Sequence, residues 1–214
     1  MARQTAISIN TIPIGPLGII GMPGCEELTD KIDQYLVKWR KTQAIEHAES
    51  IAFFGYQRDS YKIDITIPRF GSGEGKGVIN ESVRGYDIYI VCDVFNYSCT
   101  YNMYGKEVCM SPDDHFADLK RVISALCSKP KRVSVIMPML YEGRQHKRSS
   151  RESLDCAMAL KELVHLGVEN IITFDAHDQR VQNAIPDKSF ENVMPTYQMI
   201  KALVNNVDDL KVDK

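Results

Sequence analysis

The sequence predicts an α/β fold, with a mostly parallel sheet flanked by helices. Short apolar segments alternate with segments whose apolar residues recur at helical spacing, which is the pattern of a layered α/β protein. The links between these segments are short, which favours parallel strands joined by right-handed crossovers. The composition, 44% hydrophobic and 25% charged over 214 residues, is ordinary for a globular protein of this length. We expect one α/β domain over residues 17–207, an N-terminal extension at 1–16, and the start of a linker to a second domain at 208–214.

The first half of the chain contains four predicted strands and one helix. Leu17–Ile20 is a short apolar run typical of a strand, and residues 26–41 carry apolar side chains on one helical face. Tyr61–Ile67 alternates apolar and polar residues, which predicts a half-buried strand. Val78–Val83 and Tyr86–Val94 are expected to be further strands.

The second half repeats the strand–helix rhythm. Ser111 is a strong helix start, because it is followed by Pro112 and two acidic residues that suit the positive end of the helix dipole. That helix is predicted to end near Cys127, and Gly167 is expected to end another. The remaining predicted elements, in the order strand, helix, strand, helix, are Arg132–Met137, Ser150–Leu166, Asn170–Phe174 and Thr196–Asn205.

Charge and hydropathy exclude several classes of protein. The chain has 26 basic and 28 acidic residues, a net charge of −2, which argues against a general nucleic-acid binder. No apolar run approaches the roughly 20 residues of a membrane helix, and no secretory signal follows Met1. The six cysteines form no C-x-x-C pair. We therefore expect them to be reduced and buried, as small hydrophobic residues of a cytoplasmic protein: Cys25, Cys92, Cys99, Cys109, Cys127 and Cys156.

A glycine-rich segment, 69–77, is the first candidate for ligand binding. Its four glycines in seven residues allow close approach of the backbone to a ligand. It is not a Walker A phosphate-binding loop, because Lys76 is followed by Gly77 and a predicted strand. A mobile hairpin turn is the alternative, but Phe70 beside the glycines favours stacking on a base.

A basic segment, 141–152, is the second candidate. Four permanent cations and His146 lie between Arg144 and Arg151, after a predicted strand and before a predicted helix. Backbone N–H groups and cations would converge there on an anion, and a polyphosphate is the natural guest. A solvated basic loop is one alternative. An RNA-binding patch is another, disfavoured because no aromatic residue interrupts the run.

The third candidate follows the predicted strand that ends at Phe174. Alternation would place Asp175 and His177 on the same side, where together they could hold a hydrated cation. Because Mg²⁺ prefers oxygen ligands, a structural role for His177 remains the alternative.

Taken together and in this order, the motifs resemble the N-terminal half of the ribose-phosphate diphosphokinase (phosphoribosyl pyrophosphate synthetase) family, in a divergent form. The resemblance spans about Gly18 to Val204. Each motif is weak alone, and the ordered set is specific: Arg69–Glu74, Asn80–Asp87, Tyr141–Gln145, Arg151–Glu152 and Asp175–His177.

The resemblance implies a phosphoribosyltransferase-like N-terminal domain in a cytoplasmic homo-oligomer. It implies that diphosphate passes from ATP to ribose 5-phosphate, giving AMP and phosphoribosyl pyrophosphate. Adenine would be held by Phe70, Ser72 and Glu74 of a neighbouring subunit. The other residues that the family pattern assigns to ATP are Arg144, Gln145 and His146, and those that it assigns to Mg²⁺ are His177 and Asp175.

Some residues depart from the family pattern. Ser72 and His146 stand where the family usually has Asp, and Ser153 stands where it has Pro. A non-catalytic regulatory or scaffold subunit of the same fold therefore stays open. Neither acidic pair, at 113–114 and 208–209, is followed by the Thr-Gly-Thr of the ribose 5-phosphate loop. We expect the catalytic residues in a second half, and this chain by itself to be inactive.

Overall fold

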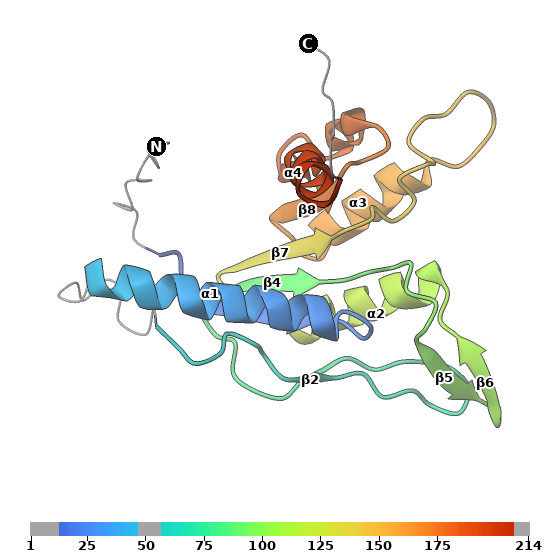
Figure 1. Cartoon of the computed structure of the whole chain (residues 1–214). Helices are drawn as coiled ribbons and strands as arrows, with labels where there is room; N and C mark the ends of the chain where they lie inside the picture. Colours follow the sequence, from blue (N-terminus) through green and yellow to red (C-terminus); the bar gives the residue numbers. More distant parts are fainter. Residues whose placement is uncertain (1–12, 47–56, 208–214) are drawn as a thin grey trace, which may run out of the picture.

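A five-stranded parallel sheet forms the centre of the molecule (Figure 1). The structure is a computed structural model that describes residues 13–46 and 57–207, so residues 1–12 of the predicted extension and the predicted linker lie outside it. Every neighbouring pair of strands in this sheet is parallel, which confirms the predicted fold class. The strands, in spatial order, are β1 (Leu17–Gly21), β4 (Asp87–Val91), β7 (Arg132–Met137), β8 (Asn170–Phe174) and β9 (Ser189–Val193).

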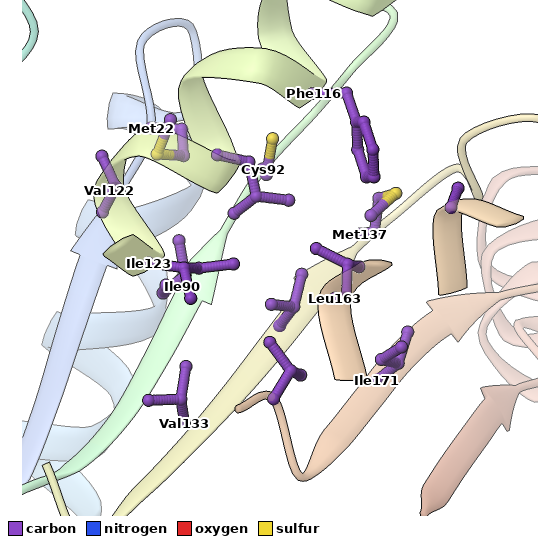
Figure 2. Packing of buried hydrophobic residues seen from close by; sticks show 14 of the residues in the cluster. Met22, Ile90, Cys92, Phe116, Val122, Ile123, Val133, Met137, Leu163 and Ile171 are labelled. Atoms are coloured by element: carbon purple, nitrogen blue, oxygen red, sulfur yellow. The ribbon is translucent and has the colours of Figure 1, made fainter. Parts of the chain in front are cut away.

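Apolar clusters cover both faces of this sheet. The larger cluster joins alternate strand residues such as Ile20 and Ile90 to α2 (Pro112–Ala125) and α3 (Asp155–His165), as Figure 2 shows in part. The smaller one packs Ile19 and its neighbours against α1 (Glu26–Glu46). Burial on both faces explains why β1, β4 and β7 are largely apolar, whereas β9 at the edge of the sheet alternates. The last helix, α4 (Thr196–Asn206), has no buried residue, and no helix in the described ranges is long and apolar enough to cross a membrane.

The two local helix signals operate as predicted. The Ser111 hydroxyl accepts from the Asp114 N–H at 3.2 Å, while the Asp114 carboxylate accepts from the Ser111 N–H at 2.9 Å, so the two residues form a capping box. Gly167 adopts a φ of +96° just after α3 ends. A side chain at this position would be strained, which is why glycine serves there.

Two predicted strands are much shorter than expected. The alternation over Tyr61–Ile67 does bury Tyr61 and Ile63, but only β2 (Ile65–Thr66) pairs with β3 (Val78–Ile79), as a short antiparallel ladder. Before β2, the chain touches the sheet through one bridge, in which Ile19 donates to the Tyr61 carbonyl and accepts from the Ile63 N–H. The alternation of apolar and polar residues therefore predicted correctly which side chains are buried, but it predicted a strand that is too long.

Three elements were not predicted. They are β9, a short 3₁₀ helix at Gln179–Ala184, and a hairpin of β5 (Thr100–Met103) and β6 (Lys106–Cys109). The hairpin turns through Tyr104 and Gly105, both at positive φ (+51° and +80°), as a two-residue primed turn requires. Tyrosine is an unusual residue for that conformation, so the sequence carried no turn signal.

The cysteine prediction is right for three residues and wrong for the others. All six cysteines are free thiols, and Cys25, Cys92 and Cys156 are buried. Cys99 is partly exposed, whereas Cys109 on β6 and Cys127 after α2 are exposed. Cys109 is exposed because it lies in the unpredicted hairpin, outside the main sheet.

Candidate functional site

A cavity of about 680 Å³ opens at the carboxyl ends of β4, β7 and β8, where ligands of open α/β sheets bind. Its size suits a small-molecule ligand. The loops that follow these three strands build it, with one residue from the start of α2. The lining residues are Phe95, Tyr97, Pro112, Met139, Leu140, Tyr141, Glu142, Gly143, Arg144, Phe174, Asp175, Ala176 and His177.

Two acidic residues of this lining have left-handed backbone conformations. Glu142 has φ +54° and Asp175 has φ +46°. Such conformations cost energy for residues other than glycine and cluster at functional sites. Asp175 is held there because its N–H donates to the Val193 carbonyl at 3.1 Å and the next N–H donates to the Asn192 side chain at 2.9 Å. The unpredicted strand β9 therefore supports the Asp175 loop.

Tyr141 fixes the other side of the cavity to α2. Its ring stacks on Phe116 with the centroids 4.3 Å apart, and its hydroxyl donates to Asp113 at 2.6 Å. Burial and this hydrogen bond raise the pKa of Tyr141. Burial, and then the carboxylates of Asp155 and Asp113, raise the pKa of Glu142 above its ordinary value. The site thus contains a carboxyl group that takes up a proton more readily than usual.

Of the predicted residues in the basic segment, only Arg144 lines the cavity. The Gln145 side chain instead donates to the Ser153 carbonyl at 2.9 Å and closes the 145–153 loop. One ring nitrogen of His146 lies 3.2 Å from the Arg144 carbonyl, and the other lies 3.4 Å from the Asp178 carboxylate. The His146 ring also meets the edge of His177, with the centroids 5.1 Å apart. His146 therefore joins the Arg144 loop to the Asp175 loop.

The anion site predicted at a helix N-terminus is not formed in that way. The helix begins at Asp155 instead of Ser150, and no side chain caps it. The Glu152 carboxylate accepts from the N–H groups of Ser149 and Ser150, at 2.6 and 3.3 Å. Such local side-chain bonds compete with helix formation. Part of the backbone that was expected to receive an anion is already bonded within the loop.

Asp175 and His177 both line the cavity, although not for the predicted reason. Strand alternation stops at Phe174, and the left-handed Asp175 turns the chain. No group of three or more His, Cys, Asp or Glu side chains that could hold a metal ion occurs within residues 13–46 and 57–207. A cation bound here would therefore take most of its ligands from water or from a bound anion.

The glycine-rich segment lies elsewhere on the molecule. Phe70, Ser72 and Glu74 do not line the cavity. Their loop rests on the β5–β6 hairpin, where the Tyr104 N–H donates to the Gly71 carbonyl at 2.9 Å (Figure 1). Phe70 is 58% exposed, and the Ser72 hydroxyl donates to the Glu74 carboxylate at 2.8 Å. The structure therefore does not bring the predicted adenine residues together with Arg144 in one chain.

Several lining residues were not singled out from the sequence. Phe95, Tyr97 and Met139 lie in the loops that follow β4 and β7, so their position near the carboxyl edge of the sheet was the signal available in the sequence. Their sequence context alone does not distinguish them from core residues.

Comparisons with known proteins agree with this architecture. A sequence profile described as the N-terminal domain of ribose phosphate pyrophosphokinase matches residues 17–167. A ribose-phosphate pyrophosphokinase of Vibrio cholerae is 25% identical over 150 residues, which cover 68% of this chain and 43% of that protein. Ribose-phosphate pyrophosphokinase 1 of Schizosaccharomyces pombe is 29% identical over 148 residues, which cover 68% of this chain and 32% of that protein.

A solved structure shares the fold. The crystal structure of phosphoribosylpyrophosphate synthetase from Mycobacterium smegmatis superposes with a TM-score of 0.64 at 19% identity, over 89% of this chain and 52% of that chain. The chain thus spans less than half the length of these curated relatives and about half of the solved structure.

Proposed function

This chain belongs to the family of the N-terminal domain of ribose phosphate pyrophosphokinase, and from that membership we propose that it binds Mg²⁺ and ATP. The observation that supports this is the convergence of Arg144, Asp175 and His177 on one cavity. The reaction proposed for the whole protein is transfer of diphosphate from ATP to ribose 5-phosphate, giving phosphoribosyl pyrophosphate and AMP.

Arg144 is proposed to bind the polyphosphate. Its guanidinium can donate to two phosphate oxygens at once, a geometry that lysine lacks. Asp175 and His177 would hold Mg²⁺, which supplies charge neutralisation on the polyphosphate. The fit is that of a cation that keeps phosphate and water oxygens as its other ligands, since Asp175 and His177 together offer one carboxylate and one imidazole. Gln145 and His146 shape the loop that presents Arg144.

Phe70, Ser72 and Glu74 are proposed to contact the adenine bound by a second copy of the chain. Their distance from the Arg144 cavity within one chain and the exposure of Phe70 favour this arrangement. A homo-oligomer with shared sites follows from it.

Calorimetric titration with Mg²⁺–ATP tests the nucleotide site. Arg144→Ala should weaken binding by about 1.5–3 kcal/mol, the usual loss of a charge-assisted contact. Lys147→Ala is the matched control, because Lys147 is an exposed cation of the same loop that does not line the cavity. Equal, small losses in both variants would contradict the proposal.

A non-catalytic, nucleotide-binding subunit of the same fold is the second candidate. It is favoured by His146 and Ser72, which replace acids of the family pattern. A coupled assay with ATP, Mg²⁺ and ribose 5-phosphate, performed on this chain joined to the C-terminal half of a relative, separates the two, because only a catalytic member should then form phosphoribosyl pyrophosphate. We expect this chain alone to form no phosphoribosyl pyrophosphate, and AMP formation that depends on ribose 5-phosphate would overturn that expectation.

A further inference from the structure

A second cavity, of about 600 Å³, lies at the carboxyl end of β1 and away from the Arg144 site. The end of β1, the first two turns of α1 and the segment around β2 enclose it, and α1 and β2 can be followed in Figure 1. Its wall is charged on one part and apolar on another. The lining residues are Gly21, Pro23, Glu26, Thr29, Asp30, Ser60, Lys62, Ile63, Asp64, Ile65, Ile67 and Glu81.

The charged part of the wall has four carboxylates and a single lysine, which leaves a formal charge of −3. One oxygen of each carboxylate is fixed by a hydrogen bond of 2.6–3.1 Å. Its second oxygen has no hydrogen-bond partner in the described part of the chain, so it is held in place and free to accept from a ligand. The four fixed contacts are Gly24 N to Glu26, Lys62 Nζ to Asp30, Asn80 Nδ2 to Asp64, and Asp64 N to Glu81.

Thr29 provides an independent sign of a ligand. Its side chain is one of the cavity's lining groups but only 2% exposed, and its hydroxyl has no hydrogen-bond partner among the described residues. The hydroxyl lies against the end of β1, since a Cβ added to Gly21 would come within 2.6 Å of it. A buried hydroxyl without a partner is costly, and a donor placed in the cavity would remove that cost.

The chemistry of the wall identifies the class of ligand. A bare metal ion does not fit, because the described residues contain no group of three acidic, His or Cys side chains able to hold one. Ile63, Ile65 and Ile67 offer an apolar surface beside the carboxylates. A chain of methylene groups would cover that surface while ammonium groups at its ends met the free oxygens.

We propose that this cavity binds a linear aliphatic diamine or polyamine. The ammonium groups donate to the free oxygens of Glu26, Asp30, Asp64 and Glu81 and to the Thr29 hydroxyl. The proposal is independent of the nucleotide site, because the two cavities share no residue.

A titration of the whole chain with putrescine, and a second one with spermidine, tests this site at about 0.15 M salt. Binding is measured by calorimetry and by changes in amide chemical shifts. Glu81→Gln keeps an oxygen for the Asp64 N–H but removes a charge, so it should weaken putrescine binding about three- to tenfold. Thr29→Val should weaken binding by a similar factor and leave the melting temperature of the free protein unchanged or higher.

Matched controls are available for both variants. Thr173→Val removes the other fully buried threonine hydroxyl without a partner, which does not line this cavity. Glu162→Gln removes an exposed carboxylate paired with Lys120. Neither control should change putrescine affinity.

Three results would overturn the proposal. The first is the absence of shifts in the lining amides at millimolar putrescine. The second is equal putrescine affinity in the wild type, Glu81→Gln and Thr29→Val. The third is a tetralysine peptide that displaces spermidine and binds at least tenfold more tightly, which would assign the site to a basic protein segment instead of a free amine.

Discussion

The Arg69 guanidinium donates to the Asp118 carboxylate over 2.7 Å, and this contact attaches the glycine-rich loop to α2. The side chains are 10% and 2% exposed. Arg121 donates to the other Asp118 oxygen at 2.5 Å, and Arg69 also donates to the Gly73 carbonyl at 3.0 Å. One buried carboxylate therefore positions the loop that carries Phe70 and Glu74.

Asp118→Asn should destabilise the protein by about 3 kcal/mol, because it leaves two guanidinium groups without a buried charge partner. Urea unfolding measures the loss. Glu162→Gln, which removes an exposed ion pair with Lys120, should cost no more than about 1 kcal/mol. If the two variants shift the urea midpoint equally, Asp118 does not have this role.

Gly77→Ala should destabilise the protein by about 1–3 kcal/mol. A Cβ there would lie 2.8 Å from the backbone carbonyl of Arg121, and helix backbone does not yield easily. Gly71→Ala is the control in the same loop, since its Cβ would meet nothing within 4 Å. Thermal unfolding compares them, and a melting temperature that falls no further for Gly77→Ala than for Gly71→Ala would refute the close contact.

Glu142 should make stability depend on pH. Burial raises its pKa in the folded protein above the ordinary value of about 4.3. At a pH between the pKa of Glu142 in the unfolded chain and its higher pKa in the folded protein, the folded protein binds more protons than the unfolded chain. The contribution of Glu142 to the free energy of unfolding therefore falls as pH rises. Glu142→Gln removes that contribution. As pH rises from 4 to 7, urea unfolding should show the free energy of unfolding of the variant increasing relative to that of the wild type. Parallel plots of this free energy against pH for the two proteins would disprove the prediction.

The thiols should differ in their rate of alkylation. Burial raises the pKa of Cys25 and of Cys156 to about 11, so little thiolate exists at neutral pH. Cys109 and Cys127 are exposed. Iodoacetamide followed by peptide mass spectrometry should find these two modified first, and early modification of Cys25 in the folded protein would contradict the burial described here.

The sequence alone predicted the fold class, four of the five strands of the main sheet and the helix ends that depend on nearby residues. The capping box at Ser111 and the glycine stop at Gly167 involve residues a few positions apart, so their chemistry is visible in the chain itself. The mostly apolar segments at β7 and β8 predicted the strand bounds correctly, because both strands are largely buried and therefore rich in Val and Ile. The ordered motifs also indicated the family to which the chain belongs.

The sequence could not place the sites in space. Phe70 and Arg144 belong to one family pattern but lie apart, because the β5–β6 hairpin and Asp118 hold the glycine-rich loop away from the Arg144 cavity. That arrangement depends on contacts between residues far apart in the chain, and its turn uses a tyrosine at positive φ that no local pattern indicates. Asp175 reaches the cavity because β9 holds its loop, another long-range contact. Local chemistry thus predicts elements, whereas side chains from distant elements meet only when the packed core orients them.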